Sequence, residues 1–116
     1  MKKVMFVYGT LKRGFSNHRL MGQSKYLGKT LVPGLKMFSM GGFPGCIKSG
    51  DNDDEVIGEL YEVTSEEVLQ DLDWLEGHPD FYRRTEVNTF HGIAETYLVD
   101  PSYIQGRSIV SDGDWK

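Results

Sequence analysis

Glycine is the residue that most constrains what this chain can fold into. The sequence holds 14 glycines among 116 residues, which is about 12% against roughly 7% in average proteins. They are spread along the chain, and the stretches between them are rich in aromatic and β-branched residues. Glycine is typical of turns, and such stretches are typical of strands. The sequence therefore predicts short strands joined by tight turns.

The chain length and the net charge exclude several classes of protein. A chain of 116 residues can build one hydrophobic core and is too short for two, so we expect a single domain over residues 1–116. The net charge of −4 argues against a general nucleic-acid binder. The apolar run at residues 4–8 is too short for a signal peptide or a membrane span. We therefore expect a cytoplasmic protein without nucleic-acid or membrane partners, a monomer or a weak homodimer.

The pattern of residues predicts a mixed α+β fold. We expect strands at residues 3–8, 26–32, 35–40, 56–63, 82–90 and 93–99, the last two forming a hairpin. Residues 41–45 are expected to be an irregular loop, and a short helical turn is expected at 18–23, capped by Ser16 or Asn17. The acidic residues 51–54 are interpreted as a solvated loop, because Val56 stands where a calcium loop needs glycine. The simplest closure is a small mixed β-barrel with one main helix packed across it and short flanking helices.

The main helix is expected at residues 65–75. Thr64 and Glu67 form a capping-box signature at its start. Four apolar residues at helical spacing form one stripe along it: Val68, Leu69, Leu72 and Leu75. Gly77 and Pro79 are expected to end the helix.

The first candidate site is the turn after the first strand, Tyr8-Gly9-Thr10-Leu11-Lys12. Successive backbone N–H groups in a glycine-centred turn can converge on an anion. The alternative is an ordinary turn without a ligand. The basic residues around it, Lys12, Arg13, His18 and Arg19, could attract an acidic substrate or simply form a solvated loop.

The second candidate site is Glu76, at the end of the main helix. The helix dipole disfavours a carboxylate there, and the neighbouring aromatic residues favour desolvation. Both effects would raise the pKa of Glu76 and suit it to general base catalysis near neutral pH. The alternative is an ordinary surface glutamate. His78 is close enough in sequence to enter the same site.

No metal or disulfide site is expected. The three histidines and the single cysteine, Cys46, are too widely spaced for a zinc motif. A lone cysteine cannot form an internal disulfide. Because no base is near it in sequence, Cys46 is interpreted as an inert, buried or half-buried thiol.

Several of these segments, taken in order, resemble the γ-glutamylcyclotransferase-like family, in particular its small AIG2-like branch. The likeness covers nearly the whole chain, and any one segment alone is weak. The matching residues are Phe6 to Lys12, Gly14, Asn17, Phe43-Pro44-Gly45, Val56 to Val63, Leu72-Asp73-x-Leu75-Glu76-Gly77, Tyr82-Arg83-Arg84 and the closing Ser111 to Trp115.

The resemblance implies a small β-barrel whose pocket is formed by the glycine loop. It implies that Glu76 is the general acid/base of an enzyme that cyclises a γ-glutamyl amide to 5-oxoproline and releases the amine. By the same resemblance, Tyr8, Tyr82 and Tyr97 line the pocket, while Gly9, Thr10 and Leu11 hold an anionic part of the substrate or the developing oxyanion. No cofactor or metal is implied. The alternative is a non-catalytic module on the same fold that binds a γ-glutamyl or carboxylate metabolite.

Overall fold

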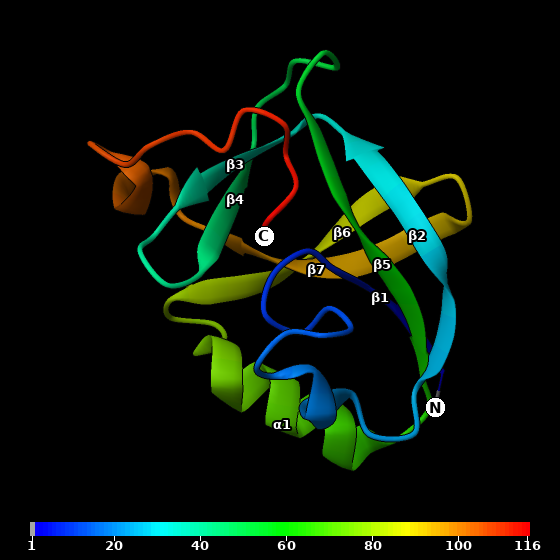
Figure 1. The fold of residues 1–116 in the computed structure, drawn as a ribbon. Helices are drawn as coiled ribbons and strands as arrows, with labels where there is room; N and C mark the ends of the chain where they lie inside the picture. Colours follow the sequence, from blue (N-terminus) through cyan, green and yellow to red (C-terminus); the bar gives the residue numbers. More distant parts are fainter. Residues whose placement is uncertain (1) are drawn as a thin grey trace.

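The computed structural model describes residues 2–116 and combines two sheets with one α-helix (Figure 1). The elements in chain order are β1 (Lys3–Val7), η1 (His18–Met21), β2 (Lys25–Pro33), β3 (Leu35–Ser39), β4 (Pro44–Lys48), β5 (Glu55–Val63), α1 (Glu66–Glu76), β6 (Tyr82–Thr89), β7 (Gly92–Val99) and η2 (Pro101–Ile104). The mixed α+β class expected from the sequence is confirmed.

The main sheet has five strands in the order β2-β5-β1-β7-β6. Strand β1 lies at its centre, antiparallel to β5 and parallel to β7, and every other pairing in this sheet is antiparallel. Met5, Phe6 and Val7 are buried, as expected of an unbroken apolar strand that is covered on both faces. The glycine loop directly follows this buried strand and therefore begins in the interior of the protein.

The expected small β-barrel is not confirmed, because the main sheet is not closed in residues 2–116. The sheet curls until its edge strands β2 and β6 contact each other, but within residues 2–116 no ladder of hydrogen bonds joins them. Val32 of β2 and Val87 of β6 belong to the same buried cluster. Right-handed twist brings the edges together, and side chains rather than backbone groups then fill the space between them.

Strands β3 and β4 form a separate two-stranded sheet, and β4 was missed in the sequence. Gly41, Gly42, Pro44 and Gly45 had been interpreted as an irregular loop, yet Pro44 is the first residue of β4. Proline is tolerated at that position because the first residue of a short edge strand need not donate to the ladder. Residues 108–110 run beside β3, where Ser39 N donates to Ser108 O at 2.8 Å.

Helix α1 packs against one face of the main sheet, away from the β3–β4 hairpin (Figure 1). Its cap is Ser65, whose hydroxyl accepts from Val68 N, so the helix begins one residue later than the capping box predicted. Leu72 is fully buried at the centre of the expected apolar stripe. Gly77 ends the helix in the left-handed conformation, with φ of 66°, which glycine adopts without steric cost. This stop leaves Glu76 as the last residue of the helix.

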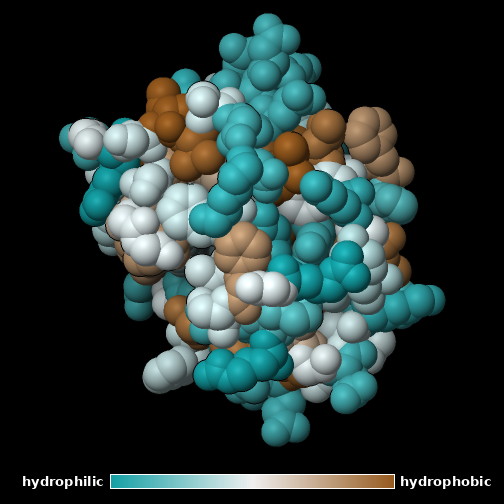
Figure 2. All heavy atoms as spheres, in the orientation of Figure 1, coloured by the Kyte–Doolittle hydropathy of each residue, from teal (hydrophilic) through white to brown (hydrophobic). Residues whose placement is uncertain are grey.

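The surface is largely polar, with apolar side chains scattered over the face shown in Figure 2. No helix in residues 2–116 is long and apolar enough to cross a membrane.

Candidate active site

A pocket of about 400 Å³ opens at the end of β1, and it is lined by all seven residues that the family resemblance assigned to the site. They are Tyr8, Gly9, Thr10, Leu11, Glu76, Tyr82 and Tyr97. Segments from the whole length of the chain meet there, namely the loop after β1, the last turn of α1, the start of β6 and the middle of β7. This volume lies in the range of pockets that bind small molecules.

The glycine loop is held by its carbonyl groups and leaves its amides free. Lys12 N donates to Gly9 O at 3.1 Å, and Asn17 N donates to Thr10 O at 3.0 Å. Within residues 2–116, no backbone hydrogen bond has the amide of Gly9, Thr10 or Leu11 as its donor. Unpaired amides in such a turn can bind an anion.

Asn17 fixes the loop instead of capping the helical turn that follows it. Its Nδ2 donates to Thr10 Oγ1 at 3.0 Å, and its side chain makes no capping hydrogen bond to η1. A Cβ on Gly9 would lie 2.8 Å from Pro44 Cγ. The loop can therefore lie against the start of β4 only because residue 9 has no side chain.

Glu76 is a partly buried carboxylate that has no partner. No hydrogen bond or ion pair of residues 2–116 involves its side chain. Burial raises its pKa from 4.5 to about 7. The sequence predicted this direction, and desolvation is the cause that the structure supports. Near neutral pH, this carboxyl group can both accept and donate a proton.

Three tyrosine hydroxyls around the pocket are already engaged as donors. Tyr8 donates to Tyr97 O, Tyr82 donates to Pro44 O, and Tyr97 donates to Asp73 Oδ1 at 2.6 Å. Burial raises the pKa of each phenol well above its ordinary value. These tyrosines are therefore neutral and fixed in position, and they shape the pocket walls.

A known protein family matches the chain over nearly its whole length. The sequence profile of the family described as "Gamma-glutamyl cyclotransferase, AIG2-like" matches residues 5–116. The chain belongs to this family. The resemblance seen in the sequence is thereby confirmed.

Individual members of the AIG2-like family match the chain over nearly its whole length. A Vibrio cholerae protein that bears the name "Putative gamma-glutamylcyclotransferase" is 35% identical over 116 residues, covering 99% of this chain and 96% of the relative. The solution structure of YtfP from Escherichia coli is 30% identical, covers 97% of this chain and 95% of its own, and has a TM-score of 0.74. A mouse AIG2-like protein shares the fold, with 24% identity, a TM-score of 0.79 and coverage of 99% and 88%.

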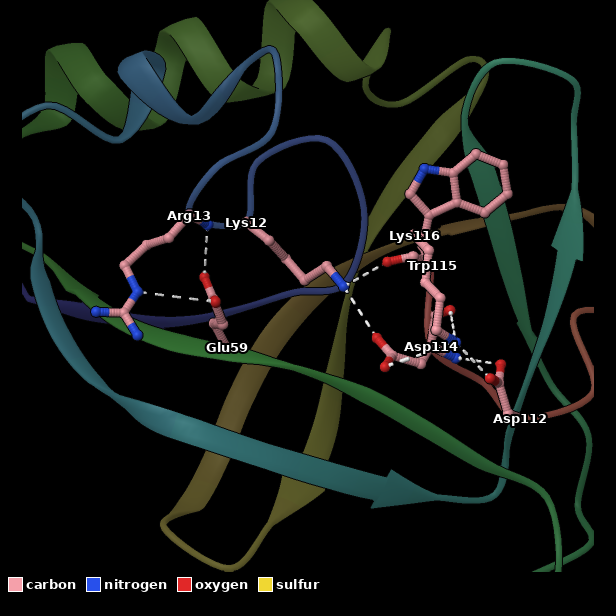
Figure 3. A network of polar contacts seen from close by, with 7 residues as sticks. All are labelled: Lys12, Arg13, Glu59, Asp112, Asp114, Trp115 and Lys116. Carbon is pink, nitrogen blue, oxygen red and sulfur yellow. Dashed lines mark hydrogen bonds and ion pairs between the residues drawn. The ribbon is translucent and has the colours of Figure 1, made fainter.

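In this AIG2-like protein, two of the basic residues beside the glycine loop, Lys12 and Arg13, make structural contacts (Figure 3). Lys12 is only 7% exposed. Its Nζ lies 3.1 Å from Asp114 Oδ1 and donates to Trp115 O at 2.8 Å. Arg13 lies over the Tyr26 ring, and its amide donates to Glu59 at 2.9 Å. Neither the solvated-loop interpretation nor substrate attraction therefore fits Lys12.

The closing segment that Lys12 holds fits tightly against β5. Gly113 is buried with φ of 65°, and a Cβ there would lie 2.0 Å from Glu55 O. Ile57 N donates to Gly113 O at 2.8 Å. The segment from Asp112 to Lys116 thus connects β5 to the glycine loop (Figure 3).

A cluster of charged residues supports Tyr97 from outside the pocket. Arg84 Nε lies 3.4 Å from Asp73 Oδ1 and 3.6 Å from Glu95 Oε1. His78 lies beside this charged cluster, where its Nδ1 accepts from Arg84 N at 3.1 Å, and it does not line the pocket. The possibility that His78 enters the site is therefore wrong.

The expected burial of Cys46 is confirmed, whereas several residues of the pocket were not predicted. Cys46 is fully buried and its thiol pKa is raised by burial, so it is the inert thiol that the sequence indicated. Among residues 2–116, no group of three potential metal ligands was found. The other residues that line the pocket were not predicted as site residues, Ser16, Phe43, Phe81 and Thr96 among them. Of these four, Phe43 had a signal as part of the Phe43-Pro44-Gly45 segment that resembles the family.

Proposed function

We propose that this protein is a γ-glutamylcyclotransferase of the transferase/lyase class, which cyclises a γ-glutamyl amide to 5-oxoproline and releases the free amine. The observation that carries the proposal is the unpartnered carboxylate of Glu76, which lines the same pocket as the free amides of the glycine loop. A proton carrier and an anion site are thereby available to one bound molecule.

In the proposed reaction, the substrate supplies its own nucleophile. Glu76 removes a proton from the α-ammonium group, and the free amine attacks the γ-carbonyl carbon to form a five-membered ring. The bond between this carbon and the amide nitrogen then breaks. Glu76 returns its proton to the departing nitrogen, and the ring nitrogen gives up its second proton, which the released amine takes up to leave as an ammonium ion. The carboxylate is thereby regenerated and no water is consumed. Because ring closure is intramolecular, correct positioning supplies much of the rate.

The glycine loop and the tyrosines have binding roles in this proposal. The amides of Gly9, Thr10 and Leu11 bind either an anionic group of the substrate or the oxygen that becomes negative during attack. Tyr8, Tyr82 and Tyr97 fix the shape of the pocket around the folded substrate. The reaction needs no cofactor or metal. We propose that it takes place in the cytoplasm on a small molecule, in a protein that is a monomer or a weak homodimer.

The test is release of 5-oxoproline by purified protein from a panel of γ-glutamyl amides. Glu76→Gln is compared with Glu67→Gln, which alters an exposed glutamate on the same helix. We expect release by the wild type and by Glu67→Gln, and its loss in Glu76→Gln. Near-wild-type release by Glu76→Gln would contradict the proposal. Tight binding of an amide without release would favour the non-catalytic binding module.

A further inference from the structure

The exposed residues among those that line the pocket show where its mouth lies. Of the residues that line it, only Ser16, Gly42 and Phe43 are exposed. The loop after β1 and the β3–β4 turn therefore frame the opening. Glu76 is partly buried and Tyr8 and Tyr82 are buried, so these residues form the interior.

This arrangement fixes which part of the substrate faces outward. In the proposed reaction, the α-amine and the γ-carbonyl must reach Glu76 and the glycine-loop amides. The group attached to the leaving nitrogen is the one part that varies among γ-glutamyl amides. Since the reacting atoms occupy the interior, this group extends toward the mouth.

An aromatic cluster forms one side of that mouth. Phe81 lies at its centre, with its ring centroid 4.8 Å from those of both Tyr82 and Tyr103. Phe43 meets Phe81 edge-to-face at 6.3 Å. Its residues come from the β3–β4 turn, the α1–β6 connection, the first residue of β6 and η2. Phe43 and Tyr103 are 39% and 43% exposed, so part of this apolar surface is available for a ligand.

The scarcity of charged residues in the pocket also favours an apolar leaving group. Among residues 2–116, no lysine, arginine, histidine or aspartate lines it, and Glu76 is its one ionisable carboxylate. A charged leaving group would find no opposite charge among the described residues that line the pocket, apart from Glu76 in its interior. An apolar group would bury surface against the aromatic rings.

Resting on the proposed function, we propose that Phe43 and Phe81 form a subsite that selects γ-glutamyl amides whose leaving amine bears an apolar, preferably aromatic, group. Aromatic pairs prefer offset or edge-to-face contacts, and the exposed faces at the mouth accommodate such a ring. The two residues are specificity determinants and take no part in proton transfer.

The experiment compares kcat/KM for four amides: γ-glutamyl-phenethylamide, γ-glutamyl-ethylamide, an anionic γ-glutamyl-aminobutyrate and a cationic γ-glutamyl-diaminobutane. We expect the phenethylamide to exceed the ethylamide by about tenfold, the scale of one favourable aromatic contact. The two charged amides should not exceed the ethylamide. The difference should lie mainly in KM, because the subsite binds the ground state and the transition state alike.

Variants separate selectivity from folding. In Phe43→Ala and Phe81→Leu, we expect the ratio of phenethylamide to ethylamide kcat/KM to fall by about tenfold. Phe90→Ala removes an aromatic ring that is 80% exposed, outside the pocket, and should keep the wild-type ratio. Phe43→Ala keeps the test valid if Phe81→Leu does not fold.

The outcomes distinguish this inference from the proposed function. Cleavage of all four amides with equal kcat/KM, or preference for a charged one, would overturn the aromatic subsite and leave the cyclotransferase activity standing. An unchanged ratio in both mouth variants would also overturn it. Absence of release from every amide by the folded wild type would contradict the proposed function itself.

Discussion

The last turn of α1 carries two carboxylates in opposite surroundings. Asp73 accepts a hydrogen bond from Tyr97 and lies 3.4 Å from Arg84. Glu76, three residues later, faces the pocket and has no partner among residues 2–116. In the proposed function, the same functional group on the same helix thus serves once for structure and once for chemistry. Its neighbours, and not its type, decide its role.

The largest expected difference between the two carboxylates is in turnover. Glu76→Gln should lower kcat by about 10²–10⁴-fold, because it removes the group that carries the proton. Asp73→Asn should lower kcat by less than about tenfold, because Asp73 acts only through the position of Tyr97. Steady-state kinetics with one amide substrate measures both. Equal losses in the two variants would break the comparison.

The second expected difference is in the pH profile. The proposed reaction begins with ionised Glu76, whose pKa is raised by burial to about 7. We expect kcat/KM to fall about tenfold for each pH unit below 7, reaching about 100-fold at pH 5. Asp73→Asn should keep the position of this limb. A rate that stays level down to pH 5 would show that Glu76 is not the titrating base.

The third expected difference is in stability. Because the pKa of Glu76 is about 7 in the folded state against an ordinary 4.5, the folded state binds more protons between these values. Stability therefore decreases as pH rises from about 4.5 to 7, and the cost is complete above 7. Glu76→Gln has no charge to bury, so it should exceed the wild type by about 1–3 kcal/mol at pH 8. Urea unfolding at pH 8 and 4.5 measures this, and a gap that persists at pH 4.5 would argue against it.

Asp73→Asn should shift stability in the other direction. Arg84 Nε and Nη1 are buried and lack hydrogen-bond partners among residues 2–116, so Arg84 depends on its two carboxylate neighbours. Removing one of them should destabilise the fold by about 1–3 kcal/mol at neutral pH. Thermal unfolding of Asp73→Asn beside an exposed control, Asp71→Asn, tests this. A loss equal to that of the control would show that Asp73 is not structural.

The smallest effect is expected from removing the hydroxyl of Tyr97, whose ring lines the pocket and whose hydroxyl donates to Asp73. Tyr97→Phe keeps the ring in the pocket wall and removes the hydrogen bond to Asp73. We expect a loss of about 1 kcal/mol of stability, the usual net contribution of one hydrogen bond. Denaturant titration gives the change, and the kcat measured beside it should fall less than in Asp73→Asn.

Local patterns in the sequence predicted much of the site. The apolar stripe and Gly77 placed the end of α1 at Glu76 to within one residue, because helix periodicity and a glycine stop are both local signals. The direction of the Glu76 pKa also followed from its neighbours in sequence. Strand β4 was missed because Pro44 and Gly45 are typical of loops, and only pairing with β3 makes that segment a strand.

Contacts between distant segments could not be predicted in this way. Lys12 was interpreted as a basic loop residue because its partner, Asp114, is 102 residues away. Closure of the sheet into a barrel could not be predicted from the sequence for a related reason. Whether β2 and β6 pair depends on how the whole sheet twists, and no local pattern records that. The role of Phe43 at the pocket mouth likewise required the fold that brings it beside Phe81.

The contact between Lys12 and the closing segment also sets an order in time. At about 5 to 20 residues per second, the ribosome needs roughly 5 to 20 s to synthesise the 102 residues that separate Lys12 from Asp114. Throughout this interval Lys12 lacks the carboxylate that pairs with it in the folded protein. The glycine loop therefore receives this support only after the closing segment has been made.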